Sequence, residues 1–342
     1  MATVSRALNG SPEVSEATRK RIIELAESLD YTPSAAARTL VSRRSHVVGV
    51  ILDTGLGHPD LLHPFFQEVL VGLKHGAGSL GYDLLLFASE EPGNGFGGTH
   101  SYLRRAGHHG VDGAIVMGFD GRDPEIARLA ASGLPTVAVD ADIDGPRTGS
   151  VMSENEEGAR LAVRHLHELG HERIATITGM LGTRPGADRL DGYGYELADL
   201  GLELPAEYVV EGDFYDESGY HATRRLLDLG EPPTAVFAAS DLMAAGALRA
   251  ASELDVRVPE DLAVVGFDDI ALAGLIQPSL TTVRQEMHAI GEAAAEALGQ
   301  MIDDPETQPV RRIVPTRLVV RSSTEMNGAP RERTLASDKE VR

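Results

Sequence analysis

Acidic and small polar residues follow the apolar runs in the middle of this sequence, and their side chains could bind a small polar molecule. The residues in such positions are Asp53, Asp120, Asp140, Asp213, Ser240, Asp241, Asp268 and Asp269. Carboxylates accept hydrogen bonds from hydroxyl and amino groups, so several of them lining one crevice would hold a polar ligand. Arg189 could add the planar donor fork that such sites often use.

Each of these residues also has a simpler interpretation. An Asp that follows a strand can cap the next helix, and we assign that role to about half of them, Asp216 and Asp241 foremost. For Arg189, an exposed surface position agrees equally well with the spacing.

Other patterns that could carry chemistry are weaker. Residues 93–98 match G-x-G-x-x-G, but two preceding glutamates would repel a pyrophosphate, which favours a surface loop over a dinucleotide site. His58 and His63, like His108 and His109, lack a supporting carboxylate motif, so we expect solvated histidines rather than metal ligands. Cysteine is absent and no nucleophile elbow occurs. These patterns indicate no reaction, so we expect a protein that is not an enzyme and that binds no cofactor and no metal.

Strands and helices alternate from His46 onward. Apolar strands are predicted at 47–52, 82–88, 111–118, 135–140, 173–178, 208–213, 235–239 and 262–267, and helices at 65–80, 124–132, 156–169, 216–229 and 242–254. Such alternation is typical of parallel sheets covered on both faces, in which ligands bind outside the carboxyl ends of the strands. Eight strands exceed one compact unit, so we predict an α/β fold with two doubly wound parallel-sheet lobes.

The first 45 residues differ from the rest in pattern and charge. Ser15 caps a predicted amphipathic helix that ends near Tyr31, Thr32-Pro33 breaks it, and a short helix follows at 35–41. This segment carries about +2, whereas the whole chain carries -21. A basic head could therefore contact DNA while the acidic body is repelled by it.

The 342 residues contain no apolar run of about 18 residues and no signal-peptide pattern at the start. We expect a cytoplasmic protein without membrane contact. The predicted domains are a partial helix-turn-helix head at 1–32, a hinge helix and linker at 33–45, a two-lobed core at 46–325 and a disordered tail at 326–342.

Several segments together resemble the lactose-repressor/purine-repressor family of bacterial transcription regulators. They are residues 2–10 (ATVSRALNG), 14–19 (VSEATR), 31–40 (YTPSAAARTL), 63–66 (HPFF), 169–174 (LGHERI), 189–193 (RLDGY), 265–269 (VGFDD) and 280–285 (LTTVRQ). Each is weak alone, but this order and spacing are specific. The resemblance extends to about Thr324, and it implies a helix-turn-helix head followed by a core like periplasmic sugar-binding proteins.

The resemblance also implies which residues contact DNA. Ala2 and Arg6 correspond to residues that contact bases, and Thr3 and Ser5 to residues that contact phosphate. Leu40 matches the leucine that wedges into the minor groove, with Ala37 packed beside it and Arg38 near the DNA. The family's head starts one helix earlier, so we expect about fifteen residues to be missing before Met1.

For the core, the resemblance implies effector contacts from both lobes. The matching positions are Phe65, Phe66, Asp140, Arg189, Phe214, Ser240 and Asp268. Phe214 matches an aromatic residue that stacks on the ligand. The chain departs from the usual family residues at Ser153–Asn155 and at Ser240, both near the expected cleft.

The resemblance thus predicts a homodimeric regulator, a repressor that binds a pseudo-palindromic operator and is controlled by a small polar effector, a sugar being the commonest kind in the family. Two other classes stay open on the residues alone. One is a solute-binding protein without DNA activity, and the other is a nucleotide-dependent enzyme on the same fold.

Overall fold

The computed structural model describes residues 3–4, 7, 13–29, 44–52, 60–88, 101–119 and 123–325. The chain divides into two compact units, Met1–Ser45 and His46–Arg342. Among the described residues, no helix is both long and apolar enough to cross a membrane.

In the first unit, α2 (Glu16–Ser28) confirms the predicted amphipathic helix, although it ends slightly earlier than expected. The Ser15 hydroxyl accepts a hydrogen bond from the Thr18 amide at 3.4 Å, as an N-cap does. Thr3 is helical and exposed. The other predicted DNA contacts, Ala2, Ser5, Arg6, Ala37, Arg38 and Leu40, lie outside the described residues, as does the predicted tail at 326–342.

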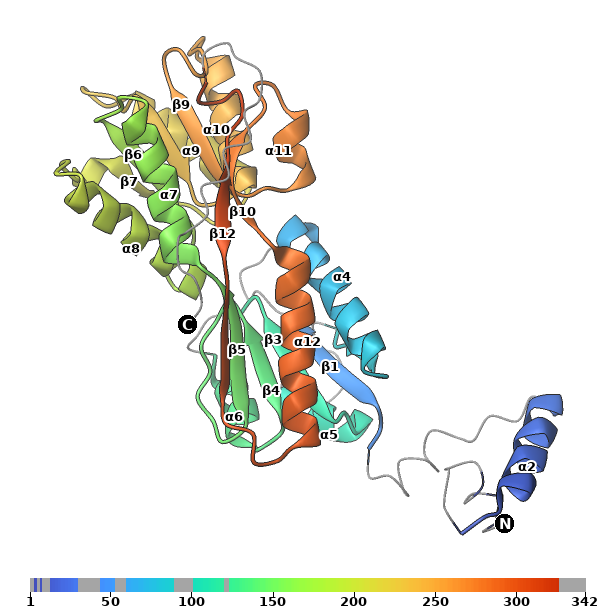
Figure 1. Cartoon of the computed structure of the whole chain (residues 1–342). Helices are drawn as coiled ribbons and strands as arrows, with labels where there is room; N and C mark the ends of the chain where they lie inside the picture. Colours follow the sequence, from blue (N-terminus) through green and yellow to red (C-terminus); the bar gives the residue numbers. More distant parts are fainter. Residues whose placement is uncertain are drawn as a thin grey trace. The chain divides into compact units, whose positions relative to one another are not determined.

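The second unit contains two sheets, each with helices on both faces (Figure 1). The first sheet has the order β11-β5-β4-β3-β1-β2, and all its neighbouring strands are parallel. Its strands are β1 (Val47–Leu52), β2 (Asp83–Leu86), β3 (Gly113–Met117), β4 (Thr136–Val139), β5 (Thr148–Ser153) and β11 (Val310–Val314). Helices α4 (Pro64–Ser79) and α12 (Met287–Asp303) cover one face, and α5 (Tyr102–His109) and α6 (Pro124–Ala131) cover the other. We call this half the N lobe.

The second sheet, in the C lobe, has the order β12-β10-β9-β8-β6-β7. Its strands are β6 (Ile174–Thr178), β7 (Val209–Glu211), β8 (Ala235–Ala238), β9 (Ala263–Asp268), β10 (Thr281–Gln285) and β12 (Thr316–Val319), the last antiparallel to β10. Helices α7 (Asn155–Glu168) and α8 (Arg184–Asp199) pack on one face, and α9 (Asp216–Leu227) and α10 (Asp241–Glu253) pack on the other. The short helix α11 (Ala271–Leu275) follows β9. The predicted pair of doubly wound lobes is thus confirmed.

The chain passes between the lobes at three places, which together form the hinge. They lie between β5 and α7, between β10 and α12, and between β11 and β12. The Glu154 amide donates to the Val314 carbonyl at 2.9 Å, so two of these connections are hydrogen-bonded to each other. The site residues nearest the hinge are therefore held by short, paired segments.

Four strands were not expected from the sequence. β5 is fully buried, but its residues TGSVMS are small and half polar, so it lacks the Val/Ile/Leu run of a central parallel strand. β10 begins with two buried threonines, and β11 and β12 are short strands at sheet edges with mixed exposure. Their placement depends on partners that are distant in the sequence.

Candidate ligand-binding site

A cleft lies between the two lobes, at the carboxyl ends of their parallel strands. About 740 Å³ of space lies between its walls, part of it open to solvent. Most of its surface is apolar, and a few charged and polar side chains lie among the rings. Six of the seven predicted contacts line it, namely Phe65, Phe66, Asp140, Arg189, Phe214 and Asp268.

Three of these residues have backbone conformations that favour glycine. Asp140, Phe214 and Asp268 have φ angles of 52°, 72° and 121°. Side chains with a Cβ avoid this region, and such strain is concentrated at binding and catalytic sites. The three residues follow or end β4, β7 and β9, so the strand ends turn sharply where their side chains meet the cleft.

Arg189 is the buried cation of the site. Its guanidinium donates to the Asn155 side chain at 2.8 Å and to the Ala239 carbonyl at 2.6 Å, and it lies 3.8 Å from an Asp268 oxygen. It also stacks over the Phe267 ring, 3.8 Å from its centroid. Burial lowers the pKa of Arg189, and the charges of Asp268 and Asp140 act in the opposite direction. The alternative of an exposed surface arginine is therefore wrong.

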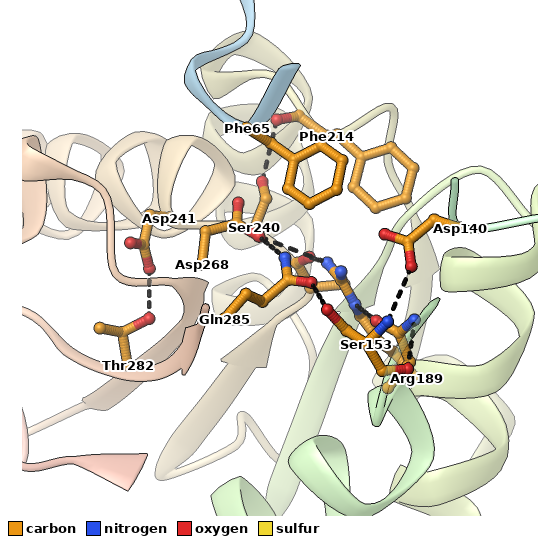
Figure 2. A network of polar contacts seen from close by, with 12 residues as sticks. Phe65, Asp140, Ser153, Arg189, Phe214, Ser240, Asp241, Asp268, Thr282 and Gln285 are labelled. Carbon is orange, nitrogen blue, oxygen red and sulfur yellow. Dashed lines mark hydrogen bonds and ion pairs between the residues drawn. The ribbon is translucent and has the colours of Figure 1, made fainter. Parts of the chain in front are cut away.

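A chain of hydrogen bonds joins the lobes through the hinge (Figure 2). Gln285 donates from its amide nitrogen to Asp268 at 2.6 Å, and its amide oxygen accepts from the Ser153 hydroxyl. The Ser153 amide in turn donates to Asp140 at 3.0 Å. Asp268 of the C lobe is thus connected to Asp140 of the N lobe through one residue from each of two hinge strands.

Burial raises the pKa values of the carboxyl groups around this series of hydrogen bonds. It raises the pKa of Asp268, while the positive charge of Arg189 and the Gln285 hydrogen bond lower it. It also raises the pKa of Asp140, with Arg189 again opposing. Asp241 lies behind Asp268 and is bonded to Thr282 at 2.5 Å and to the Ile270 amide at 2.9 Å. Burial and the nearby Asp268 charge raise the pKa of Asp241.

Aromatic rings form the apolar part of the cleft. Phe65 and Phe66 project from the start of α4 in the N lobe, with their ring centroids 5.3 Å apart. Phe214 projects from the C lobe, and Figure 2 shows it with Phe65 on one side of the polar network. A side chain at Gly179 would place its Cβ 1.9 Å from the Phe214 ring, so only glycine there leaves room for that ring.

The structure corrects several predictions about the polar residues. Ser240 does not line the cleft. It caps α10 by accepting from the Met243 amide at 3.1 Å, and it donates to the Phe214 carbonyl at 2.9 Å. Asp241 is therefore not the cap of α10, and Asp216 does not cap α9, whose N-cap is Tyr215 without a side-chain bond. Asp53 and Asp120 lie outside the described residues, as do His58 and residues 93–98.

Gln285 and His63 are among the cleft residues that were not predicted from the sequence. Gln285 belongs to a hinge strand, β10, that was not predicted. His63 was expected to be solvated, but it is buried at the start of α4 and lines the cleft. Its position directly before a proline and a predicted helix is a capping signal that could have indicated this. In the part of the chain that the structure describes, no cluster of side chains is suited to hold a metal ion.

Comparison with known proteins shows to which family the chain belongs. Residues 1–34 match the profile of bacterial regulatory proteins of the lacI family, and residues 163–324 match that of the periplasmic binding protein-like domain. The regulator CelR of Thermobifida fusca is 38% identical over 94% of both chains. The chain belongs to the lacI family of bacterial regulatory proteins. The resemblance seen in the sequence is therefore confirmed.

Solved structures of lacI-family members share the fold. A CelR-cellobiose complex superposes with a TM-score of 0.73 at 34% identity, covering 94% of this chain and 95% of the other. The lac repressor dimer bound to operator and the anti-inducer ONPF gives a TM-score of 0.79 at 28% identity and covers 94% of both chains. These relatives are transcriptional regulators rather than enzymes.

Proposed function

We propose that this protein is a homodimeric transcriptional repressor whose affinity for a pseudo-palindromic operator is controlled by a sugar bound between the lobes. The observation that carries the proposal is the cleft, in which carboxylates and one arginine are buried among aromatic rings. Sugars combine hydroxyl groups, which pair with carboxylates, and apolar ring faces, which stack on aromatic side chains. The cellobiose complex of CelR supports a sugar as the class of ligand.

The proposed division of labour follows the chain. Residues 1–32 would bind the operator, with Ala2 and Arg6 at base edges and Thr3 and Ser5 at phosphates. Residues 33–45 would form the hinge segment, with Leu40 in the minor groove and Ala37 and Arg38 beside it. Residues 46–325 would bind the effector and the second subunit. The lac repressor dimer on its operator supports this arrangement.

Control would pass through the hinge. An effector that contacts both lobes stabilises one angle between them, and ligands shift such an equilibrium only by their differential affinity for its two states. The hydrogen-bonded chain from Asp268 through Gln285 and Ser153 to Asp140 would make that angle depend on the cleft residues. A coupling free energy of about 1–3 kcal/mol is typical of such linkage.

Thermal unfolding in the presence of cellobiose, D-glucose and D-ribose tests the proposal. A sugar at a hundred times its Kd should stabilise the native state by about 2.7 kcal/mol and raise Tm by roughly 5 °C. Calorimetry would then give its Kd. Stabilisation without any effect on DNA binding would favour a solute-binding protein, whereas turnover of the added compound would favour an enzyme.

A further inference from the structure

The start of α4 determines which ring nitrogen of His63, in the N lobe, carries a hydrogen. The Phe65 amide donates to the His63 Nδ1 atom at 3.3 Å, so this nitrogen carries a lone pair and no hydrogen. Burial, and next the positive charge of Arg189, lower the pKa of His63 to about 4. The ring is therefore neutral near pH 7, and its hydrogen is on Nε2.

The Nε2–H group of His63 is buried and has no hydrogen-bond partner among the described residues. The Phe214 carbonyl lies near enough to act on the pKa of His63, but it does not accept a hydrogen bond of normal geometry. The ring cannot easily turn toward another partner. It packs edge-on against Tyr215 of the C lobe, with centroids 5.5 Å apart, and against Phe66 at 6.0 Å.

A complementary group lies in the other lobe. Asp268 uses one carboxylate oxygen to accept from Gln285, and its second oxygen is buried. The Asp241 amide lies near enough to lower the pKa of Asp268, but in the described part of the chain the second oxygen has no hydrogen-bond partner of normal geometry. Both His63 and Asp268 line the same cleft. The cleft therefore has a hydrogen-bond donor from the N lobe and an acceptor from the C lobe, and neither is paired with any residue that the structure describes. Buried polar groups of this kind are normally paired.

We propose that His63 is an effector-contacting residue, whose Nε2–H donates to an oxygen of a sugar while a hydroxyl of the same sugar donates to the free oxygen of Asp268. This inference rests on the proposed sugar-binding function and names the group that contacts the sugar from the N lobe. Both protein atoms are covered in the present arrangement of the lobes, so the sugar would reach them while the lobes are further apart and be enclosed with them when the cleft closes. One ligand would then satisfy a group of each lobe and favour the closed arrangement.

The substitution His63→Asn removes the proposed contact with the sugar but keeps the N-cap of α4. Asparagine is a good N-cap and can still accept from the Phe65 amide, but it is too short to place a donor where Nε2 lies. His221→Gln, on the exposed face of α9, is the matched control. We expect calorimetry with cellobiose, D-glucose and D-ribose to show a Kd about tenfold to a hundredfold higher for His63→Asn, with little change in Tm. The control should bind like the wild type.

Equal sugar affinity of wild type and His63→Asn would overturn this inference and leave the proposed function standing. If the wild type bound none of the three sugars, the proposed function would fail instead. A second measurement tests the premise without a ligand. Nitrogen-15 NMR of the histidine side chains should find the His63 hydrogen on Nε2 at pH 7, and a hydrogen on Nδ1 would overturn the inference.

Discussion

The two lobes present different chemistry to the same cleft. The C lobe contributes Arg189 and Asp268, which are only 3% and 2% exposed and are held by several hydrogen bonds. The N lobe contributes two phenylalanines, a neutral histidine and Asp140. Buried charges are costly unless they are paired, and Arg189 and Asp268 are close enough to compensate each other within one lobe before any ligand arrives. We therefore propose that the C lobe orients a ligand and that the N lobe closes over it.

Contacts between the lobes are of several kinds, and they include apolar packing of Ile270, Leu242 and Leu272 of the C lobe against the core of the N lobe. At the hinge, Ser153 bonds to Gln285. In the cleft, the His63 ring meets Tyr215, and near its rim Arg184 of α8 bonds to Asp142 of the N lobe at 2.7 Å. If the lobes move, we expect these polar contacts to break and re-form, whereas the Arg189 network lies inside the C lobe and should persist.

The largest expected effect comes from breaking the C-lobe network. Arg189→Met removes the cation beside Asp268 and leaves buried carboxyl groups without a counter-charge, so the free energy of unfolding should fall by about 3–5 kcal/mol. Urea denaturation measures this. Arg225→Met, at an exposed position on α9, is the control and should change stability by less than about 0.5 kcal/mol. Similar losses in the two variants would contradict the role given to Arg189.

The second-largest expected effect is on the pH dependence of stability, to which His63 of the N lobe and Asp268 of the C lobe contribute with opposite signs. The pKa of His63 in the folded state, about 4, is below its usual value of 6.5, so the unfolded state binds the extra proton first as the pH falls. Stability should therefore drop between pH 6.5 and pH 4, by at most about 3 kcal/mol from this group. Asp268 acts in the opposite sense, because its raised pKa stabilises the fold at low pH and this contribution is lost as the pH rises.

Urea unfolding of wild type and His63→Asn at several pH values isolates the contribution of His63 to the pH dependence of stability. The variant should be less sensitive to acid than the wild type, whereas His221→Gln should follow the wild-type curve. Parallel curves for His63→Asn and wild type would show that the buried histidine does not titrate as described.

A smaller effect concerns the Phe214 ring. In Gly179→Ala the new methyl group would clash with that ring, which must leave its place in the cleft. We expect the Kd for a bound sugar to rise about tenfold, equivalent to about 1.4 kcal/mol. Gly230→Ala, where a Cβ would meet no atom within 4 Å, is the control for calorimetry. Unchanged sugar affinity in Gly179→Ala would remove Phe214 from the site.

The smallest effect should come from the ion pair between Arg184 and Asp142. Both side chains are partly exposed, and Arg184 also bonds to Asp188 of its own helix at 2.6 Å. A double-mutant cycle with Arg184→Ala and Asp142→Ala, read as sugar affinity, should give a coupling of at most about 1 kcal/mol. A much larger coupling would mean that this pair, rather than the cleft residues, determines closure.

Local pattern was sufficient for part of the fold and of the site. Apolar runs such as β1 and the strand-end rule led to Asp140 and Asp268, because the carboxyl ends of parallel strands meet at one edge. The capping rule set Asp241 apart from Asp268, but it did not indicate that Ser240 is the cap of α10 or that Asp268 ends its strand at a positive φ. Gln285 and His63 were missed because their roles come from contacts with the other lobe, which sequence periodicity does not contain.

The most direct test of the account measures operator binding with and without the effector. DNA duplexes selected from a random pool by the full-length protein would be titrated by fluorescence anisotropy, with no sugar and then with a saturating concentration of one that binds the cleft. We expect the sugar to change the operator Kd by about 5- to 150-fold, and we expect Arg189→Met to abolish this change. The same operator Kd at zero and saturating sugar would contradict the account.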